Sequence, residues 1–177
     1  MKKPRLKPGQ KEFSILLIPK GETYNKLSSL IIRLSNKYNT PMFKPHVTLI
    51  GGFDISEKDA ISKTTEIAKN LKPYSIKINN LLYLNEYYKS LFLKVEKTKD
   101  VIKANFLARK IFNDERNEEY FPHLSLMYGN SSNQIKEKII SEIKEINLEF
   151  GVDKIHLFST ANGPENWYKV KEFDLNK

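Results

Sequence analysis

Two short segments of the chain share a pattern of side chains that could transfer protons. One reads Pro-His-Val-Thr-Leu-Ile-Gly-Gly and contains His46 and Thr48, and the other reads Pro-His-Leu-Ser-Leu-Met-Tyr-Gly and contains His123 and Ser125. They align without a gap, so two of the three histidines occupy the same position in both copies. A lone histidine in a strand is usually a packed structural residue. A duplicated histidine with a hydroxyl residue two positions later favours a functional site.

A β-strand through each segment would place its histidine and its hydroxyl side chain together. Side chains at positions i and i+2 of a strand point to the same face, so His46 lies beside Thr48 and His123 beside Ser125. The intervening apolar residues would face the core: Val47, Leu49, Leu124 and Leu126. If a pseudo-two-fold axis relates the two strands, both pairs meet in one cleft.

This set of groups suits the hydrolysis of a phosphodiester. The reaction needs a base that deprotonates the attacking water and an acid that protonates the leaving alkoxide, on opposite sides of phosphorus. His46 and His123 can do either near neutral pH because the unperturbed pKa of histidine is about 6.5. Thr48 and Ser125 could donate hydrogen bonds to the non-bridging oxygens. Neither segment contains a carboxylate, so we expect no metal ion and no other cofactor.

Helical and strand periods alternate around these segments, which predicts a mixed α+β domain with four helices and about seven strands. The expected helices span 24–38, 56–71, 101–111 and 135–146. The expected strands span 13–18, 46–53, 74–83, 90–96, 121–128, 152–159 and 167–173. No Gly/Ser-rich or Pro-rich linker divides the chain, so we expect a basic N-terminal tail at 1–12 and one domain at 13–177.

The composition fits a globular protein and excludes several kinds of site. Hydrophobic residues make up 40% of the 177 residues, and no apolar run approaches the roughly 20 residues that span a bilayer. With no cysteine, the chain has no disulfide, thiol nucleophile or Cys-ligated metal. The start of the chain is basic and lacks the apolar stretch of a secretory signal. We therefore expect a cytoplasmic monomer with no membrane partner.

The formal net charge of +9 raises the question of nucleic-acid binding, because Lys and Arg neutralise phosphates. About +4 of it belongs to residues 1–12, which hold five basic side chains and one glutamate, and +5 is left for the rest. The excess is nearly all lysine and accompanies abundant Asn and Ile, so genome composition explains it as well as phosphate binding does. A weak RNA contact through the basic surface is an alternative.

The two segments resemble the paired His-x-Thr-x and His-x-Ser-x signature of the 2H phosphoesterase superfamily. Their flanks, Lys-Pro-His-Val-Thr-Leu and Phe-Pro-His-Leu-Ser-Leu-Met-Tyr, are most similar to the cyclic phosphodiesterase branch known from plants and fungi. A C-terminal run, Ile-His-Leu-Phe-Ser-Thr followed by Trp167, is also similar to that branch. The resemblance implies a bilobal fold, with two antiparallel sheets flanked by helices around a pseudo-two-fold central cleft.

The resemblance also implies an activity and a set of site residues. The activity is metal-independent opening of a 2′,3′-cyclic nucleotide, or of ADP-ribose 1″,2″-cyclic phosphate, to a monophosphate ester. His46 and His123 would divide the acid and base work, and Thr48 and Ser125 would bind the phosphate. Tyr128 matches a phosphate-adjacent tyrosine of the plant members, but strand parity turns it toward the core unless the strand bends.

Other residues and functions stay open. Tyr83, Tyr87 and Tyr88, at a strand end and in the next turn, could stack on a base, although packing is favoured for them and a core role for Trp167. His156 has no partner motif and is predicted to be structural. The rival functions are cleavage of linear 2′,5′-oligonucleotides or cyclic dinucleotides by the same four residues, and RNA binding without catalysis.

Overall fold

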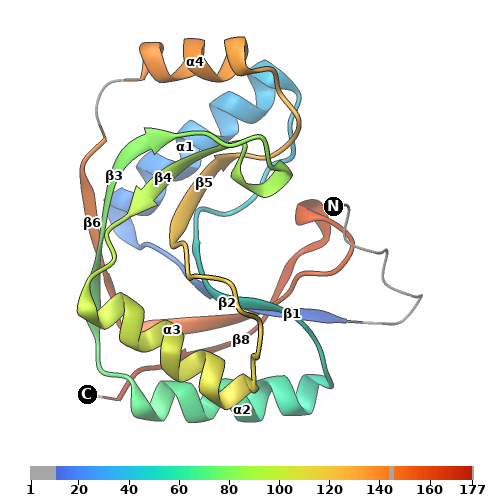
Figure 1. The fold of residues 1–177 in the computed structure, drawn as a ribbon, viewed down its shortest axis with the longest axis vertical. Coiled ribbons are helices and arrows are strands. Elements are labelled where there is room, and N and C mark those ends of the chain that lie inside the picture. Colours follow the sequence, from blue (N-terminus) through green and yellow to red (C-terminus); the bar gives the residue numbers. More distant parts are fainter. Residues whose placement is uncertain (1–10, 144–145, 177) are drawn as a thin grey trace.

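The computed structural model describes residues 11–143 and 146–176, which contain four α-helices and eight strands (Figure 1). The strands are β1 Glu12–Leu17, β2 Val47–Asp54, β3 Tyr74–Leu82, β4 Leu91–Val95, β5 His123–Met127, β6 Leu148–Val152, β7 Lys154–Ser159 and β8 Tyr168–Asp174. The helices are α1 Gly21–Tyr38, α2 Glu57–Asn70, α3 Lys99–Phe112 and α4 Asn133–Glu142. Residues 1–10, most of the predicted tail, lie outside the described residues.

The strands form one curled antiparallel sheet made of two four-stranded halves. Its order is β6-β3-β4-β5-β2-β1-β7-β8. The halves meet between β5 and β2, where Val47 and Leu124 are in register. In Figure 1, β3, β4 and β6 run steeply while β1 and β8 run across the view, so the halves turn away from each other at this seam. The α+β prediction with two antiparallel sheets is thus confirmed, the two sheets being the halves of a continuous one.

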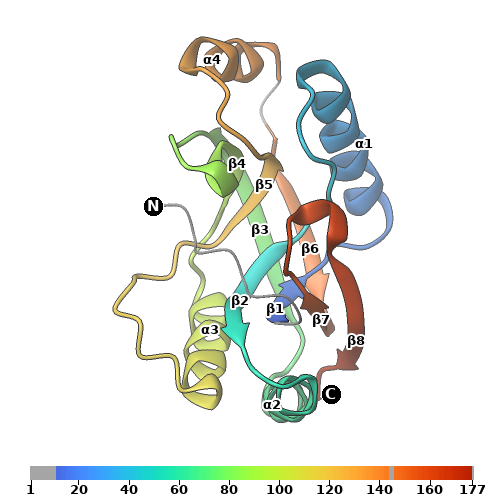
Figure 2. The ribbon, with the colours of Figure 1, turned by 90° about the vertical axis from the view of Figure 1, so that its right-hand side faces the viewer.

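Each motif strand follows a strand and a helix along the chain, in the order β1-α1-β2 or β4-α3-β5, and pairs antiparallel with that preceding strand. Both helices end at an asparagine in the left-handed conformation, Asn39 with φ 50° and Asn113 with φ 54°. The backbone N–H of each asparagine bonds to carbonyl groups of the last helical turn, which closes the helix and releases the chain. α1 packs on β5 and β6, and α3 packs on β2 as well as β3. Each helix therefore reaches across the seam, as the view in Figure 2 also shows for α1.

Both motif strands carry a bulge directly after the hydroxyl residue. In β2 the residues on either side of Leu49 pair with adjacent residues of β1, so Leu49 is an extra residue. In β5, Leu126 is extra in the same way against β4. A bulge interrupts the alternation of side chains. Gly51 and Tyr128, three positions after the hydroxyl residues, consequently return to the face of the histidines.

The residues predicted to face the core from the motif strands are buried. Val47, Leu49, Leu124 and Leu126 are each at most 1% exposed. They belong to a hydrophobic core that both halves of the sheet and all four helices share. In the described part of the chain, no helix is long and apolar enough to cross a membrane.

Two elements differ from the sequence prediction. The strand predicted at 152–159 is divided at Asp153, because β6 pairs with β3 in one half and β7 with β1 in the other. The apolar run continues through this point, so its period does not reveal that the chain changes halves there. α4 ends at Glu142 rather than at 146, since Ile143 adopts an extended conformation. The other predicted elements match helices or strands of the structure within a few residues.

Candidate active site

A cleft of about 360 Å³ gathers the motif residues of both halves. His46, Thr48, His123, Ser125 and Tyr128 all line it, so the structure brings the five predicted site residues together. The antiparallel register at the seam sets His46 across from Ser125 and Thr48 across from His123. Cβ atoms of directly opposite residues are about 4.5–5.5 Å apart. Each imidazole therefore neighbours the hydroxyl of the other motif, and the two imidazoles lie on a diagonal.

In both imidazoles, Nδ1 lies within hydrogen-bond distance of a backbone carbonyl oxygen. His46 Nδ1 lies 2.6 Å from the carbonyl oxygen of Lys44, and His123 Nδ1 lies 2.8 Å from that of Phe121. A carbonyl oxygen can accept but not donate, so we assign the proton to Nδ1, which leaves Nε2 of each ring for chemistry in the cleft. Each carbonyl belongs to a residue that precedes a proline and is therefore restricted to extended conformations. The repeated Pro-His pair thus helps to aim the ring.

Burial lowers the pKa of both imidazoles. For His46 it lowers the pKa from the ordinary value of 6.5 to about 4, with the Lys44 carbonyl opposing the shift and repulsion from His123 adding to it. The pKa of His123 is lowered by burial and by Lys89, while the carbonyl of Phe121 acts in the opposite direction. Because the two rings repel each other when both are protonated, the pair takes up its two protons in separate steps. Both rings are therefore mainly neutral at pH 7.

We expect a bell-shaped dependence of kcat/KM on pH with a maximum below 6.5. Acid–base catalysis by the two rings would need one protonated and one neutral imidazole, and the free protein reaches this state as the pH falls below the ordinary pKa of histidine. Activity falls again when the second ring is protonated, at a pH near the value of about 4 for His46. Initial rates at substrate concentrations far below KM measure this profile. A maximum on the alkaline side of neutrality would contradict the direction of both shifts.

The two hydroxyl residues differ in how they are held. Ser125 is 4% exposed, and its Oγ donates to the carbonyl oxygen of Tyr88 at 2.7 Å. Thr48 is positioned through its backbone, because the Tyr120 hydroxyl donates to the Thr48 carbonyl oxygen at 3.0 Å. Both side chains face the cleft beside the imidazole of the other motif.

The bulge in β5 turns Tyr128 into the cleft, contrary to simple strand alternation. Its ring stacks on Phe43 with centroids 3.8 Å apart, and the residue is 3% exposed. Burial raises the pKa of Tyr128, with Tyr88 acting in the same direction and the nearby Ser125 hydroxyl in the opposite one. The phenol therefore stays protonated at neutral pH and can donate a hydrogen bond.

Tyr88 and Trp167 line the same cleft. Their rings are inclined by 26° with centroids 6.3 Å apart, and the Trp167 ring contacts His46 edge-on at 5.8 Å. Sequence patterns favoured packing for both, because a single aromatic is more often part of a core. Tyr83 lies elsewhere and donates its hydroxyl to Glu137. For Trp167, the similarity of the C-terminal run to the family is a signal that could have pointed to the cleft, but a core role was favoured.

Polar residues that the sequence did not single out complete the lining: Glu12, Ser14, Lys89, Glu118 and Thr160. They come from β1, from the turn before β4, from the loop before β5 and from the end of β7, so no local pattern connects them. The hydroxyl oxygens of Ser14 and Thr160 lie 2.9 Å apart. His156, the third histidine, is not part of this lining. It is buried on β7 with its Nδ1 3.9 Å from a carboxylate oxygen of Glu172.

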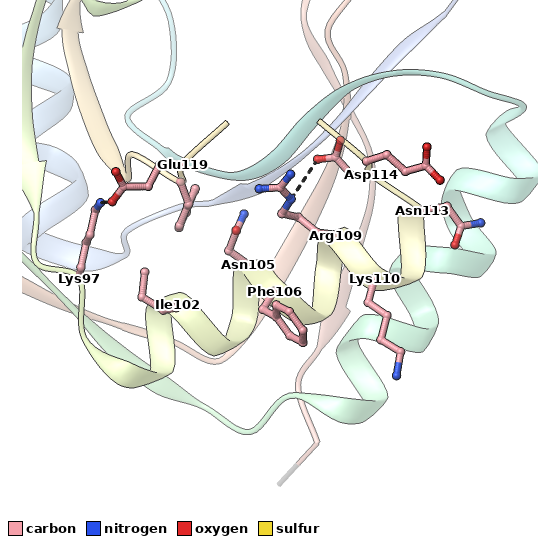
Figure 3. Close-up of a pocket in the computed structure, with 11 residues that line it drawn as sticks. Lys97, Ile102, Asn105, Phe106, Arg109, Lys110, Asn113, Asp114 and Glu119 are labelled. Atoms are coloured by element: carbon pink, nitrogen blue, oxygen red, sulfur yellow. Dashed lines mark hydrogen bonds and ion pairs between the residues drawn. The ribbon is translucent and has the colours of Figure 1, made fainter. Parts of the chain in front are cut away.

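A larger hollow of about 710 Å³ lies along α3 and contains none of the motif histidines or hydroxyl residues. Figure 3 shows the ion pairs that fasten the following loop beside this helix, Arg109 with Asp114 and Lys97 with Glu119. Arg116 also binds Asp114, with Nε and Nη2 at 2.6 and 2.9 Å from its two carboxylate oxygens. Arg109, Asp114, Lys97 and Glu119 are thus paired within the protein, and none of the motif residues lines this hollow, so size alone does not make it the reaction site.

The model of a known protein family matches almost the entire described chain. The family model described as cyclic phosphodiesterase-like protein matches residues 12–172. The chain belongs to the cyclic phosphodiesterase-like family. This membership confirms the resemblance to 2H phosphoesterases and the predicted enzyme class, a phosphodiesterase.

Individual relatives are distant in sequence but match nearly the whole length of the chain. The cyclic phosphodiesterase of Arabidopsis thaliana is 23% identical over 172 residues, which cover 93% of this chain and 95% of the relative. TT0787 of Thermus thermophilus has a TM-score of 0.70 at 14% identity, covering 93% of this chain and 97% of its own. E. coli LigT complexed with 3′-AMP has a TM-score of 0.67 at 12% identity, covering 95% and 99%. The two structures show that the chain has the LigT-like fold.

Proposed function

We propose that this protein hydrolyses cyclic phosphodiesters, either 2′,3′-cyclic nucleotides or ADP-ribose 1″,2″-cyclic phosphate, to a monophosphate ester. The observation that carries the proposal is the square of two imidazoles and two hydroxyls in one cleft, formed by His46, Thr48, His123 and Ser125. Membership of the cyclic phosphodiesterase-like family supports the same reaction class.

The diagonal placement of the imidazoles suits in-line displacement at phosphorus. The phosphorus atom would lie between Nε2 of His46 and Nε2 of His123. The neutral imidazole takes a proton from water as the water oxygen bonds to phosphorus. The protonated imidazole gives its proton to the leaving sugar oxygen as the P–O bond of the ring breaks. The two rings thereby exchange protonation states, and solvent restores the starting state.

The hydroxyl groups beside the imidazoles would hold the non-bridging oxygens of the phosphate. Thr48 and Ser125 approach from opposite motifs, so one hydroxyl is available on each side of the phosphate. Ser125 donates to the Tyr88 carbonyl, and rotation about its Cβ–Oγ bond would redirect that proton to the substrate. Tyr128 adds a protonated phenol next to Ser125. Donors placed where negative charge builds up stabilise the transition state.

The nucleoside would rest against the aromatic side of the cleft. Tyr88 and Trp167 provide flat apolar surfaces there, and stacking on such rings contributes roughly 1–3 kcal/mol per base. A further pocket of about 470 Å³ adjoins the cleft at His46 and Trp167 and is mainly apolar, with Phe43 and Phe158 in its wall. This side of the cleft can therefore accept a base without specific hydrogen bonds.

A substrate panel with identified products tests the proposal. The panel contains 2′,3′-cyclic nucleotides, ADP-ribose 1″,2″-cyclic phosphate, 2′,5′-oligoadenylate and cyclic dinucleotides, and the position of the product phosphate is determined by NMR. We expect turnover of the first two. Turnover confined to the last two would replace the proposal. The choice between a 2′- and a 3′-phosphate product would show which oxygen leaves and therefore which imidazole is the acid.

We expect turnover to be unchanged by EDTA and by added divalent cations. Neither motif supplies a carboxylate, and the acid, the base and the phosphate donors are all side chains of the chain itself. Within residues 11–143 and 146–176, no three His, Asp or Glu side chains gather closely enough to hold a metal ion. Rates are compared before and after dialysis against the chelator. Loss of activity that Mg²⁺, Mn²⁺ or Zn²⁺ restores would contradict the metal-independent reaction.

One observation favours a second candidate function, the cleavage of linear 2′,5′-oligonucleotides or cyclic dinucleotides. A pocket of about 230 Å³ adjoins the cleft at Thr48 and His123 and includes Arg109 and Arg116. A second nucleotide needs such room beside the reacting phosphate. Both arginines already bind Asp114, which reduces their charge toward a ligand, so this candidate ranks second.

A further inference from the structure

The repeat between the two halves extends from the motif strands to their neighbours, β1 and β4. The chain reads Ser-Ile-Leu-Leu from Ser14 and Ser-Leu-Phe-Leu from Ser90. In each half, the residue after the serine pairs with a residue of the adjacent motif strand. That partner is the residue directly after the bulge. Ser14 and Ser90 therefore occupy equivalent positions in the two halves.

The two serines have different surroundings. Ser90 is 0% exposed, and its hydroxyl has no hydrogen-bond partner within the described chain. Ser14 lines the catalytic cleft, and its Oγ lies 2.9 Å from Thr160 Oγ1. Ser14 and Thr160 are each 8% exposed, so this pair of hydroxyls is held firmly in the wall of the cleft.

Gly51 explains how the Ser14 hydroxyl reaches the cleft. In the alignment of the motifs, Gly51 occupies the position that Tyr128 has in the second copy. A Cβ atom at Gly51 would lie 2.3 Å from Ser14 Oγ, far inside van der Waals contact. The hydroxyl of Ser14 thus fills the space of a side chain at position 51. The first half offers a serine hydroxyl where the second half offers the Tyr128 phenol.

The hydrogen bonds around Ser14 allow an arrangement in which its Oγ acts as an acceptor toward the cleft. Thr160 Oγ1 donates to the carbonyl oxygen of Glu12 at 3.4 Å, and the Thr160 backbone N–H donates to the same oxygen at 2.7 Å. Either hydroxyl can donate in the 2.9 Å contact between Ser14 and Thr160; when the Thr160 proton is directed to Glu12, the proton of this contact comes from Ser14. The lone pairs of Ser14 Oγ then face the cleft. They cannot bind a phosphate oxygen, which is itself an acceptor, but they can accept from a hydroxyl group.

We propose that Ser14 is a specificity-determining residue that accepts a hydrogen bond from a free sugar hydroxyl of the substrate. This inference rests on the proposed hydrolysis of cyclic nucleotides. In a nucleoside 2′,3′-cyclic phosphate the 2′ and 3′ oxygens are both esterified, so the 5′-hydroxyl is the sugar donor that is left. A substrate whose 5′ oxygen carries a phosphate or another nucleotide lacks this donor. Ser14 would therefore favour small cyclic nucleosides over the ends of oligonucleotides.

The test pairs one variant with one altered substrate. Uridine 2′,3′-cyclic phosphate and its 5′-deoxy analogue are hydrolysed by the wild type, by Ser14→Ala and by Ser90→Ala. We expect the wild type to lose about 3–10-fold in kcat/KM on the 5′-deoxy analogue, the effect of one neutral hydrogen bond. Ser14→Ala should show this loss on the parent substrate and no further loss on the analogue. Ser90→Ala, the equivalent serine outside the cleft, should behave as the wild type.

Two outcomes would overturn the role of Ser14 while wild-type turnover still supports the proposed function. One is wild-type kinetics in Ser14→Ala. The other is a Ser14→Ala loss that leaves the penalty for the 5′-deoxy analogue intact, which would mean that Ser14 contacts another group. If the wild type does not hydrolyse uridine 2′,3′-cyclic phosphate, the proposed function fails. In that case, calorimetry with 3′-AMP and 5′-deoxy-3′-AMP tests the Ser14 contact separately. Equal affinities of the protein for the two nucleotides, or binding of neither, would reject the contact.

Discussion

Replacing His46 or His123 with alanine is expected to lower kcat/KM for a nucleoside 2′,3′-cyclic phosphate by about 10²–10⁴-fold. Each ring is held at Nδ1 by a backbone carbonyl and presents Nε2 to the cleft. In the described lining of the cleft there is no third imidazole to take over a lost acid or base. Steady-state rates measure the loss, and thermal unfolding of each variant shows that the protein is still folded.

The third histidine provides a matched control for this prediction. His156 is also buried in a strand of the sheet, but it lies beside Glu172 and does not line the cleft. We expect His156→Ala to keep the wild-type kcat/KM even if it lowers the melting temperature. A His156→Ala variant as inactive as the motif variants would show that loss of a buried histidine, and not loss of proton transfer, reduces the rate.

Removing the hydroxyl of Thr48 or Ser125 is expected to lower kcat by about 10²–10³-fold, the usual effect of losing one donor to a developing oxyanion. Thr48→Val keeps the shape and the β-branch of the side chain, and Ser125→Ala removes one atom from a buried position. The effect should fall mainly on kcat, because charge on the non-bridging oxygens must be held through the transition state. Rates at saturating and at low substrate separate kcat from KM.

Thr48→Ser serves as the control for Thr48→Val. It keeps the hydroxyl and loses a methyl group, so most of the activity should return. If Thr48→Val and Thr48→Ser are equally impaired, shape and packing matter at this position rather than hydrogen bonding. A rise in KM with unchanged kcat would assign Thr48 to ground-state binding instead.

The central part of the site is predictable from sequence because it depends on local patterns. The spacing of His46 and Thr48, and of His123 and Ser125, places each pair on one face of a strand, and the repeat implies that the pairs converge. The apolar residues between them are buried as expected. The repeated Pro-His pair is equally local, although the carbonyl that each ring contacts becomes visible only in the structure.

The rest of the cleft lining depends on which distant strands pair with each other. The periodicity of the sequence does not reveal that pairing. The bulge at Leu126 returns Tyr128 to the cleft, whereas a regular strand would have turned it toward the core. Ser14 and Thr160 meet through the pairing of β1 with β7. The break at Asp153 is hidden for the same reason, because an apolar run looks alike whether or not it changes its partner strand.

The most direct test of the two-imidazole account is the rate at which the double variant His46→Ala/His123→Ala opens a nucleoside 2′,3′-cyclic phosphate, measured beside both single variants in the presence of EDTA. Because the two rings act in the same step, the account predicts that the double variant is within about tenfold of the slower single variant. Wild-type turnover in either single variant would contradict it. So would losses that multiply fully in the double variant, because the rings would then act independently.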